Sequence, residues 1–282
     1  MRRGEKPFPG RYPIAQGEAE LLRDADRDNG WVINIRGVPQ SYLDLDDPTH
    51  LDFEYMRLLG DVVDRLKEGP LDAVHIGGAG CTLARYVAAT RPGSRQIVYE
   101  LDEPLVQLVR EHFPLKPFRG LKVRVGDGRA GLASLPDDSD DLVVVDAFSG
   151  AEMPVALASV EFTEQVARVL HGDGVYLVNV ADGGGLGFAR RLAATIAEVF
   201  PHLLLLGEPG VLRGRRFGNL VLAASRAPLP VAELTRVSAG KPLPARCMDT
   251  AELARFTAGH RPIRDGDDIA VPVPPPAVFG RN

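Results

Sequence analysis

The 282-residue sequence predicts an α/β fold built on a mostly parallel sheet. From about residue 71, short apolar runs alternate with amphipathic segments, a pattern typical of a parallel sheet with helices on both faces. Glycines follow the first apolar run, and an acidic residue follows each of the next three. Open α/β sheets bind ligands beyond the carboxyl ends of their strands, so we expect a binding site there.

The apolar runs and helical patterns define seven strands and three intervening helices. A closing antiparallel pair of strands is expected at one edge of the sheet. The expected strands are 72–78, 96–102, 121–128, 141–148, 174–180, 202–208 and 217–225. The expected helices are 81–90, 103–113 and 159–170.

Three regions are expected along the chain. Residues 1–50 form an N-terminal β-hairpin region, because apolar residues alternate on both sides of a turn at Gly37. Residues 51–226 form the ligand-binding domain, whose first helix has Asp47 or Thr49 as its expected cap. Residues 227–282 supply a C-terminal helix and a Pro-rich tail, "VPVPPPAVFG", expected to be extended.

Composition excludes several classes of function. The formal net charge is −5 and the basic residues are scattered, which argues against a nucleic-acid partner. No apolar run is long enough to span a bilayer, and the N-terminus lacks the apolar segment of a secretory signal. The only cysteines are Cys81 and Cys247, and no cluster has metal-ligand spacing. We therefore expect a cytoplasmic protein with no membrane partner and no bound metal.

The glycine turn "GGAG" is the first candidate site. Gly77, Gly78 and Gly80 let the backbone approach a ligand closely, next to a helix N-terminus. Glu100 ends the following strand, 22 residues after Gly78, the spacing expected of a carboxylate that binds ribose hydroxyls. A nicotinamide-binding domain would fit these features too, although Leu83 stands where its third glycine belongs.

Two further acids favour a different nucleoside. Asp127 ends the third strand and Asp146 the fourth. A site for an adenosyl sulfonium uses the third-strand acid as an acceptor for the adenine amino group, and the fourth faces the reacting centre. A carboxylate beside an attacking amine can hold it and take its proton, which makes Asp146 the candidate catalytic residue. These features indicate a Rossmann-like class I methyltransferase fold.

The chain resembles the spermidine synthase (polyamine aminopropyltransferase) family over roughly residues 25 to 225. The N-terminal hairpin and the helix opening "VEFTEQ" are an unusual combination among methyltransferases. The motifs that carry the resemblance are "GVPQS", "FEYMRLL", "IGGAGCTLAR", "YELDEPLVQLVREHF", "RVGDGRAGL", "VVVDAFSG" and "LASVEFTEQVARVLHGDGVYLVN".

The resemblance implies roles for individual residues. Gln40 and Tyr55 would face the active site, Tyr55 as a second catalytic residue. Glu100 would bind the ribose, Asp127 the adenine and Asp146 the amine. It also implies a homodimer, a small amine or other small nucleophile as partner, and no tightly bound cofactor. The co-substrate would be decarboxylated S-adenosylmethionine or S-adenosylmethionine.

Three departures from the family pattern leave the reaction open. Gly80 and Ser149 replace aspartates, and Met56 replaces a histidine. Glu152 or Asp182 could restore a carboxylate, although a surface-loop role for Glu152 and a turn role for Asp182 are the favoured interpretations. The hypotheses are therefore aminopropyl transfer to an amine, methyl transfer from S-adenosylmethionine with Gly80 making room for its carboxylate, or a nucleoside-binding module without turnover.

Overall fold

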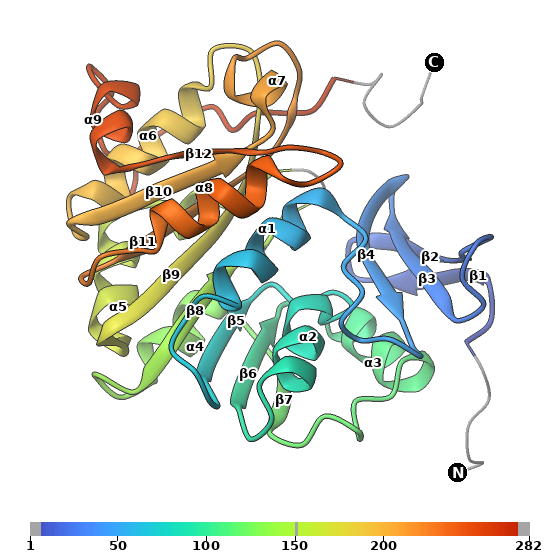
Figure 1. The fold of residues 1–282 in the computed structure, drawn as a ribbon. Helices are drawn as coiled ribbons and strands as arrows, with labels where there is room; N and C mark the ends of the chain where they lie inside the picture. Colours follow the sequence, from blue (N-terminus) through green and yellow to red (C-terminus); the bar gives the residue numbers. More distant parts are fainter. Residues whose placement is uncertain (1–6, 150–151, 276–282) are drawn as a thin grey trace.

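An eight-stranded sheet forms the centre of the molecule (Figure 1). The computed structural model describes residues 7–149 and 152–275. The strand order is β12-β10-β11-β9-β8-β5-β6-β7. The strands are β5 (Asp72–Ile76), β6 (Arg95–Glu100), β7 (Leu121–Val125), β8 (Asp140–Val145), β9 (Leu170–Asp182), β10 (His202–Gly207), β11 (Gly218–Ser225) and β12 (Arg246–Met248).

The predicted sheet is confirmed, with one addition. Strands β5 to β9 pair in parallel, and β10 and β11 form the expected antiparallel pair. The three-residue β12 pairs with β10 as an eighth strand. The β10–β11 pair therefore does not lie at the very edge of the sheet, where it was predicted. So short a strand carries no periodicity that the sequence could reveal.

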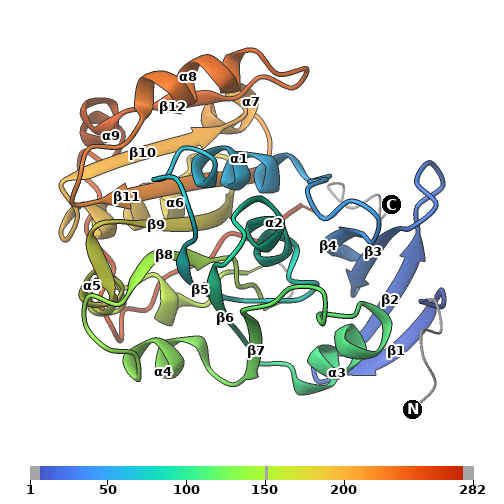
Figure 2. The same cartoon turned by 60° about the horizontal axis from the view of Figure 1, so that its bottom comes forward.

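Helices cover both faces of this sheet (Figures 1 and 2). On one face lie α1 (Glu54–Val63), α2 (Thr82–Thr90) and α8 (Val231–Ala239). On the other lie α4 (Gly128–Ala133), α5 (Val160–Val169), α6 (Gly187–Ala197) and α9 (Thr250–Phe256). Their apolar faces pack on the sheet, and side chains such as Leu59 and Phe162 are completely buried there. This burial of apolar surface is the main stabilisation of the folded domain.

The N-terminal region is larger than the predicted hairpin. It is a four-stranded antiparallel sheet of β1 (Gly10–Ile14), β2 (Gly17–Arg23), β3 (Gly30–Ile35) and β4 (Val38–Asp44). The predicted hairpin is the β3–β4 half, with Gly37 at positive φ in its turn. The sheet buries its inner face on α3 (Glu103–His112), where Trp31 meets Phe113 edge to face.

Asp102 ties the N-terminal sheet to the central domain. Its side chain caps α3 by accepting from Leu105 N, at 3.0 Å. The same carboxylate accepts from Ala15 N and Gln16 N, both at 3.1 Å, in the β1–β2 turn. One buried side chain therefore fixes the start of α3 and the position of the sheet above it.

The first helix begins later than predicted. Helix α1 starts at Glu54, with Phe53 at the N-cap position and no side-chain cap. Asp47 does not cap it, because its carboxylate accepts from Thr49 N within a local turn instead. The prediction of Asp47 or Thr49 as the cap was wrong, since Asx turns and helix caps use the same residue types.

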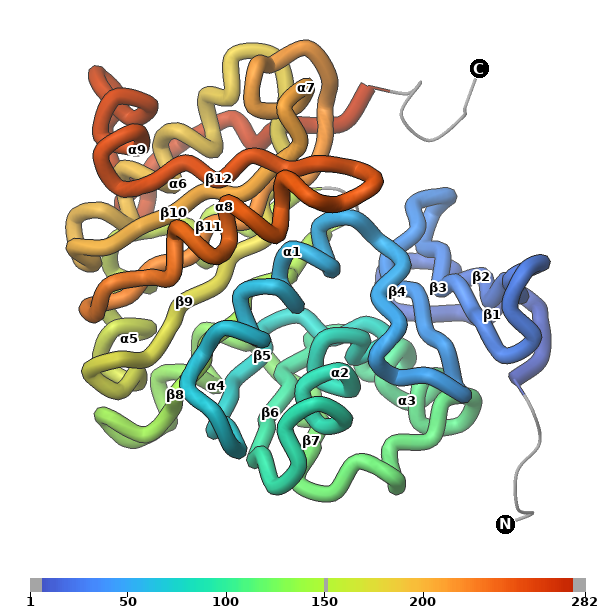
Figure 3. The backbone as a smooth tube through the Cα atoms, viewed as in Figure 1, coloured from blue at the N-terminus to red at the C-terminus, as the bar shows by residue number. Residues whose placement is uncertain are grey.

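The chain returns across α5 and α6 after α9 (Figure 3). Ile263 O accepts from Val160 N at 2.9 Å, and Ile263 N donates to Thr195 at 2.8 Å. The segment 271–275 of the predicted Pro-rich tail has no regular secondary structure, and its remainder lies outside the described residues. The smaller elements are a 3-10 turn, η1 (Val155–Leu157), and α7 (Pro209–Leu212). Within 7–149 and 152–275, no helix is both long and apolar enough to span a bilayer.

His75 is buried in β5, as expected of a core residue. It is 4% exposed, and its Nε2 shares a hydrogen bond with Gln96 Oε1 at 2.9 Å. Burial lowers the pKa of the imidazole to about 4, because a charged ring loses its hydration there. The unfolded chain therefore binds a proton at a higher pH than the folded protein does.

We predict that His75 makes the protein less stable as the pH falls from 6.5 toward 4. The lowered pKa corresponds to about 3 kcal/mol lost across that window. Urea unfolding of the wild type and of His75→Gln at several pH values measures the difference. The stability difference between the two proteins should shrink toward low pH, and a constant difference would contradict the prediction.

Candidate functional site

The site lies where β5 and β8 diverge, at the switch point of the sheet. The chain runs outward from β5 through β6 to β7, then returns to β8 on the other side of β5. Gly77 follows β5 at φ +87°, and a β-carbon there would lie 2.2 Å from the Asp146 carbonyl oxygen. Only glycine therefore lets the two strand ends come this close.

The Glu100 carboxylate organises the glycine turn. Its Oε2 accepts hydrogen bonds from Gly78 N at 2.9 Å and Ala79 N at 3.0 Å. Its Oε1 accepts from Asp102 N at 3.0 Å. The N–H groups that would bind a pyrophosphate are thus already bound to a carboxylate, which disfavours a dinucleotide.

A cavity of about 310 Å³ opens beside this turn, here named the glycine-turn cavity. It is enclosed by the turn, by the ends of β6 and β8, and by residues of the N-terminal sheet and η1. The predicted site residues on its wall are Gln40, Gly77, Gly78, Glu100, Asp127 and Asp146. The fold thus brings six of the eight predicted site residues to one cavity.

Asp127 has a structural contact as well as a place on the cavity wall. Its Oδ1 accepts from Ala130 N at 2.7 Å and caps α4. The side chain is exposed and follows β7 directly, at the same sheet edge as Glu100. The cap uses only one of the two carboxylate oxygens, so Asp127 can cap α4 and still accept a hydrogen bond from a ligand.

Gly80 does not line the glycine-turn cavity. It is buried beneath β4, where its N–H donates to Ser41 Oγ at 3.0 Å. A β-carbon at this position would lie 3.0 Å from both Ser41 Cβ and Leu43 Cδ1. A larger residue would crowd these two side chains, and Gly80 provides no additional room beside a ligand in this cavity.

Asp146 is held by two neutral donors. Asn179 Nδ2 donates to its Oδ1 at 2.8 Å, and Tyr55 Oη donates to its Oδ2 at 3.3 Å. Burial raises the pKa of the Asp146 carboxyl, while the two hydrogen bonds oppose that rise. Burial and the adjacent carboxylate raise the pKa of Tyr55 well above its ordinary value, so the phenol remains a donor.

Asn179 is a site residue that the sequence reasoning missed. It lies on β9, is 1% exposed, and accepts from Asn219 Nδ2 on β11 at 2.9 Å. The hydrogen-bonded chain Asn219–Asn179–Asp146–Tyr55 therefore fixes the carboxylate from both sides. Buried asparagines in a central strand were the available signal, because buried polar groups are generally hydrogen-bonded for a reason.

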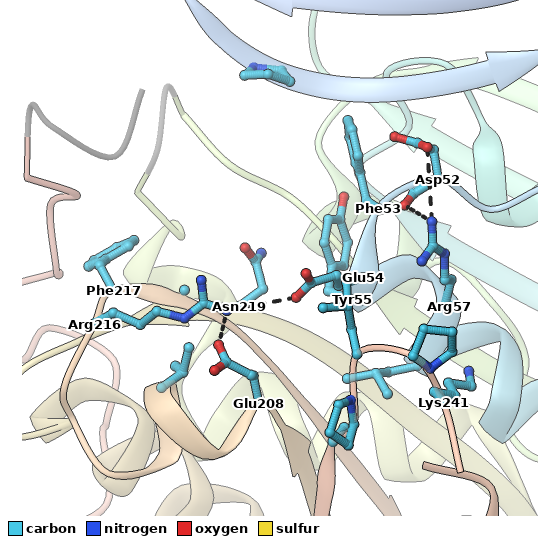
Figure 4. Close-up of a pocket in the computed structure, with 18 residues that line it drawn as sticks. Asp52, Phe53, Glu54, Tyr55, Arg57, Glu208, Arg216, Phe217, Asn219 and Lys241 are labelled. Carbon is cyan, nitrogen blue, oxygen red and sulfur yellow. Dashed lines mark hydrogen bonds and ion pairs between the residues drawn. The ribbon is translucent and has the colours of Figure 1, made fainter. Parts of the chain in front are cut away.

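Tyr55 does not line the glycine-turn cavity but the adjoining one. This second cavity, the α1 cavity, has a volume of about 710 Å³ and lies between α1, β11 and the 241–245 segment (Figure 4). Asn219 also lies on its wall. Tyr55 is hydrogen-bonded to Asp146 on the wall of the first cavity, so this pair of side chains lies between the two cavities.

The two proposed replacement acids do not reach either cavity. Asp182 is 3% exposed, and its carboxylate accepts from Gly183 N and from Ala189 N at the start of α6. Glu152 is exposed, and its backbone pairs with Ser149. Both residues have the turn or loop roles that were the alternative interpretations.

Burial raises the pKa of both cysteine thiols, Cys81 and Cys247, to about 11. Their side chains are therefore thiols at neutral pH and poor nucleophiles. Among the described residues, no three His, Cys, Asp or Glu side chains gather closely enough to hold a metal ion.

The chain is similar to several proteins of known family, although no family model matches it. It is 29% identical over 143 residues to a polyamine aminopropyltransferase of Chromobacterium violaceum, covering 50% of this chain and 53% of that protein. The chain thus spans about half the length of the curated relatives it matches. A solved probable spermidine synthase from Corynebacterium glutamicum has a TM-score of 0.87 and 34% identity, over 94% of this chain and 99% of that one.

The fold is the class I methyltransferase fold. Human methyltransferase-like protein 13, solved in complex with SAH, shares this fold with a TM-score of 0.54 and 21% identity, over 76% of this chain and 97% of that one. The match to the Corynebacterium structure has a higher sequence identity and spans almost all of both chains, so it shows the family as well as the fold. The chain belongs to the spermidine synthase family.

We predict that Asn179→Ala raises the pKa of the Asp146 carboxyl further. The Asn179 amide donates to the charged carboxylate, so removing it favours the protonated form. Carboxyl-carbon NMR of aspartate-labelled protein measures the titration, with the Asp146 signal assigned from Asp146→Asn. Asn29→Ala, which removes an amide from the distant N-terminal sheet, is the control. An unchanged or lowered pKa would show that Asn179 does not stabilise the carboxylate.

Proposed function

We propose that the protein transfers an aminopropyl group from decarboxylated S-adenosylmethionine to a small amine. The observation that carries the proposal is Asp146, a partly buried carboxylate held by two neutral donors between two cavities. A buried carboxylate without a cationic partner is costly. A cationic ligand at this position would supply the missing charge.

The glycine-turn cavity would hold the nucleoside. Glu100 retains acceptor capacity beyond its backbone bonds, since a carboxylate has about four lone-pair sites. Ribose hydroxyls could therefore share it with the glycine turn. Asp127 lies on the same wall as an acceptor for the adenine amino group, and Gln40 contributes from β4.

The reaction would then occur beside Asp146. The acceptor nitrogen attacks the aminopropyl carbon next to sulfur, the carbon–sulfur bond breaks, and its electron pair neutralises the sulfonium. Methylthioadenosine leaves. The acceptor nitrogen becomes positively charged as the carbon–nitrogen bond forms, and Asp146 takes the proton that this nitrogen loses. The Tyr55 and Asn179 contacts hold the carboxylate in place, so most of the acceleration comes from positioning.

The site favours the decarboxylated donor over S-adenosylmethionine itself. The case for methyl transfer relied on room beside Gly80 and on the absence of a repelling acid there. Gly80 is buried beneath Ser41 and Leu43 and does not line the cavity. A ligand carboxylate near Asp146 would be repelled by it. Arg129, a cation on the cavity wall, is already bound to Asp265.

The direct test is release of methylthioadenosine from decarboxylated S-adenosylmethionine. The purified protein is incubated with the donor and a panel of primary amines that includes diamines and monoamines, and products are identified by mass spectrometry. We expect amine-dependent release and an aminopropylated product. Methyl transfer from S-adenosylmethionine without any aminopropyl transfer would overturn the proposal.

Glu100→Gln should weaken methylthioadenosine binding roughly 10- to 100-fold, because charge-assisted hydrogen bonds are lost. Isothermal titration calorimetry measures the affinity. The control is Glu103→Gln, which removes an exposed acid of α3 outside the cavity wall. Equal affinities for both variants would remove Glu100 from the binding site.

Asp146→Asn should lower the transfer rate by a factor of about 100 or more, the usual effect of removing a general base. Methylthioadenosine affinity should change little, since the nucleoside contacts are elsewhere on the wall. Steady-state kinetics and calorimetry on the same preparation separate the two effects. Near wild-type turnover would show that Asp146 is not the proton acceptor.

A further inference from the structure

The charges on the wall of the α1 cavity balance one another. Three carboxylates line it, from Asp52, Glu54 and Glu208, together with three cations, from Arg57, Arg216 and Lys241. Figure 4 shows Asp52 beside Arg57 on the right of the cavity and Glu208 beside Arg216 on the left, with their contacts as dashed lines. A site for a ligand with two positive charges would instead need an excess of carboxylates.

Two of the cations are bound firmly to the protein. Arg57 donates to the carbonyl oxygens of Leu51 and Asp52, each at 2.6 Å, and lies 3.9 Å from the Asp52 carboxylate. Lys241 forms an ion pair with Asp61, which lies outside the cavity wall. These contacts fix the right-hand side of the cavity in Figure 4 and leave it without a net attraction for a second ligand cation.

Arg216 occupies the position between the remaining carboxylates. Its guanidinium forms an ion pair with Glu208, and its Nη2 lies 3.9 Å from Glu54 Oε2. Both acids could otherwise have bound a ligand ammonium. The arginine therefore places one protein cation against Glu208 and near Glu54, where a second ligand ammonium would have to bind.

Uncharged surface makes up the rest of the wall. Phe53 and Phe217 present their rings from α1 and from the loop before β11, as Figure 4 shows. The other apolar residues are Pro39, Leu58, Val211, Pro242, Leu243, Pro244 and Ala245. A ligand body in this cavity would replace water against apolar side chains, which favours apolar groups at about 25 cal/mol per Å² buried.

We propose that the acceptor is a primary amine with a single ammonium group and an uncharged, largely apolar body. This inference rests on the proposed function, because it concerns the acceptor of that same reaction. The nitrogen lies at the Tyr55 and Asn219 end, beside Asp146, and the body extends toward Phe53 and Phe217. A second ammonium on the body would face the Arg216 guanidinium and be disfavoured.

A matched pair of amines tests the charge preference. Cadaverine and n-hexylamine have the same chain length, and differ by an ammonium in place of a terminal methyl group. Binding of each to the protein saturated with methylthioadenosine is measured by calorimetry, which requires no turnover. We expect n-hexylamine to bind about tenfold more tightly. Equal affinity, tighter binding of cadaverine, or no binding of n-hexylamine would overturn the inference.

Arg216→Gln tests the cause of the preference. Removing the guanidinium frees Glu208 and Glu54, so the preference should shift toward cadaverine by about tenfold relative to the wild type. Arg215→Gln is the matched control, since this adjacent arginine is exposed and does not line the cavity. Thermal unfolding confirms that each variant is folded. An unchanged preference in Arg216→Gln would contradict the assigned role of the arginine.

The donor assay distinguishes failure of this inference from failure of the proposed function. If methylthioadenosine is released with cadaverine but not with n-hexylamine, the aminopropyl transfer stands and the inference is wrong. If neither methylthioadenosine nor the decarboxylated donor binds, the proposed function fails, and the inference fails with it.

Discussion

The Glu100 carboxylate is the interaction on which the geometry of the site depends. It accepts from three backbone N–H groups, two in the glycine turn and one at the start of α3. The third N–H belongs to Asp102, the N-cap residue of α3. The Asp102 carboxylate in turn accepts hydrogen bonds from Ala15 N and Gln16 N in the β1–β2 turn. The central sheet, the glycine turn and the N-terminal sheet are therefore connected through two neighbouring carboxylates.

The same interaction restricts which ligand the protein can accept. The backbone donors that cradle phosphate in dinucleotide-binding domains are here bound to a protein anion. The cavity beside them has three carboxylates on its wall, those of Glu100, Asp127 and Asp146. In the proposed function, this wall would bind the uncharged adenosine of the donor, and the positive sulfonium would lie near Asp146. The neighbouring α1 cavity has two of its cations in ion pairs, Arg216 with Glu208 on its wall and Lys241 with Asp61 outside it.

The central sheet and most of the site could be predicted because each signal was local in the sequence. Apolar runs fixed the strands, and Gly77, Glu100, Asp127 and Asp146 follow strands whose carboxyl ends must meet at one edge. The N-terminal sheet was underestimated because β1 buries only Ile14, and β2 only Ala19 and Leu21, so few buried apolar residues mark these strands.

Residues whose roles depend on distant partners could not be predicted. Gly80 packs beneath Ser41 and Leu43, about 40 positions earlier in the chain. Asn179 functions through Asp146 and Asn219, and Arg216 through Glu54 and Glu208. Apart from the Arg216–Glu208 pair, these contacts join segments that lie far apart in the sequence, so no local pattern indicates them.

A crystal structure with decarboxylated S-adenosylmethionine tests the central claim most directly. The account predicts the ribose on Glu100, the adenine edge at Asp127, and the aminopropyl chain directed to Asp146, between the two cavities. A nucleoside bound elsewhere, or an aminopropyl chain directed away from Asp146, would contradict the assignment of this site.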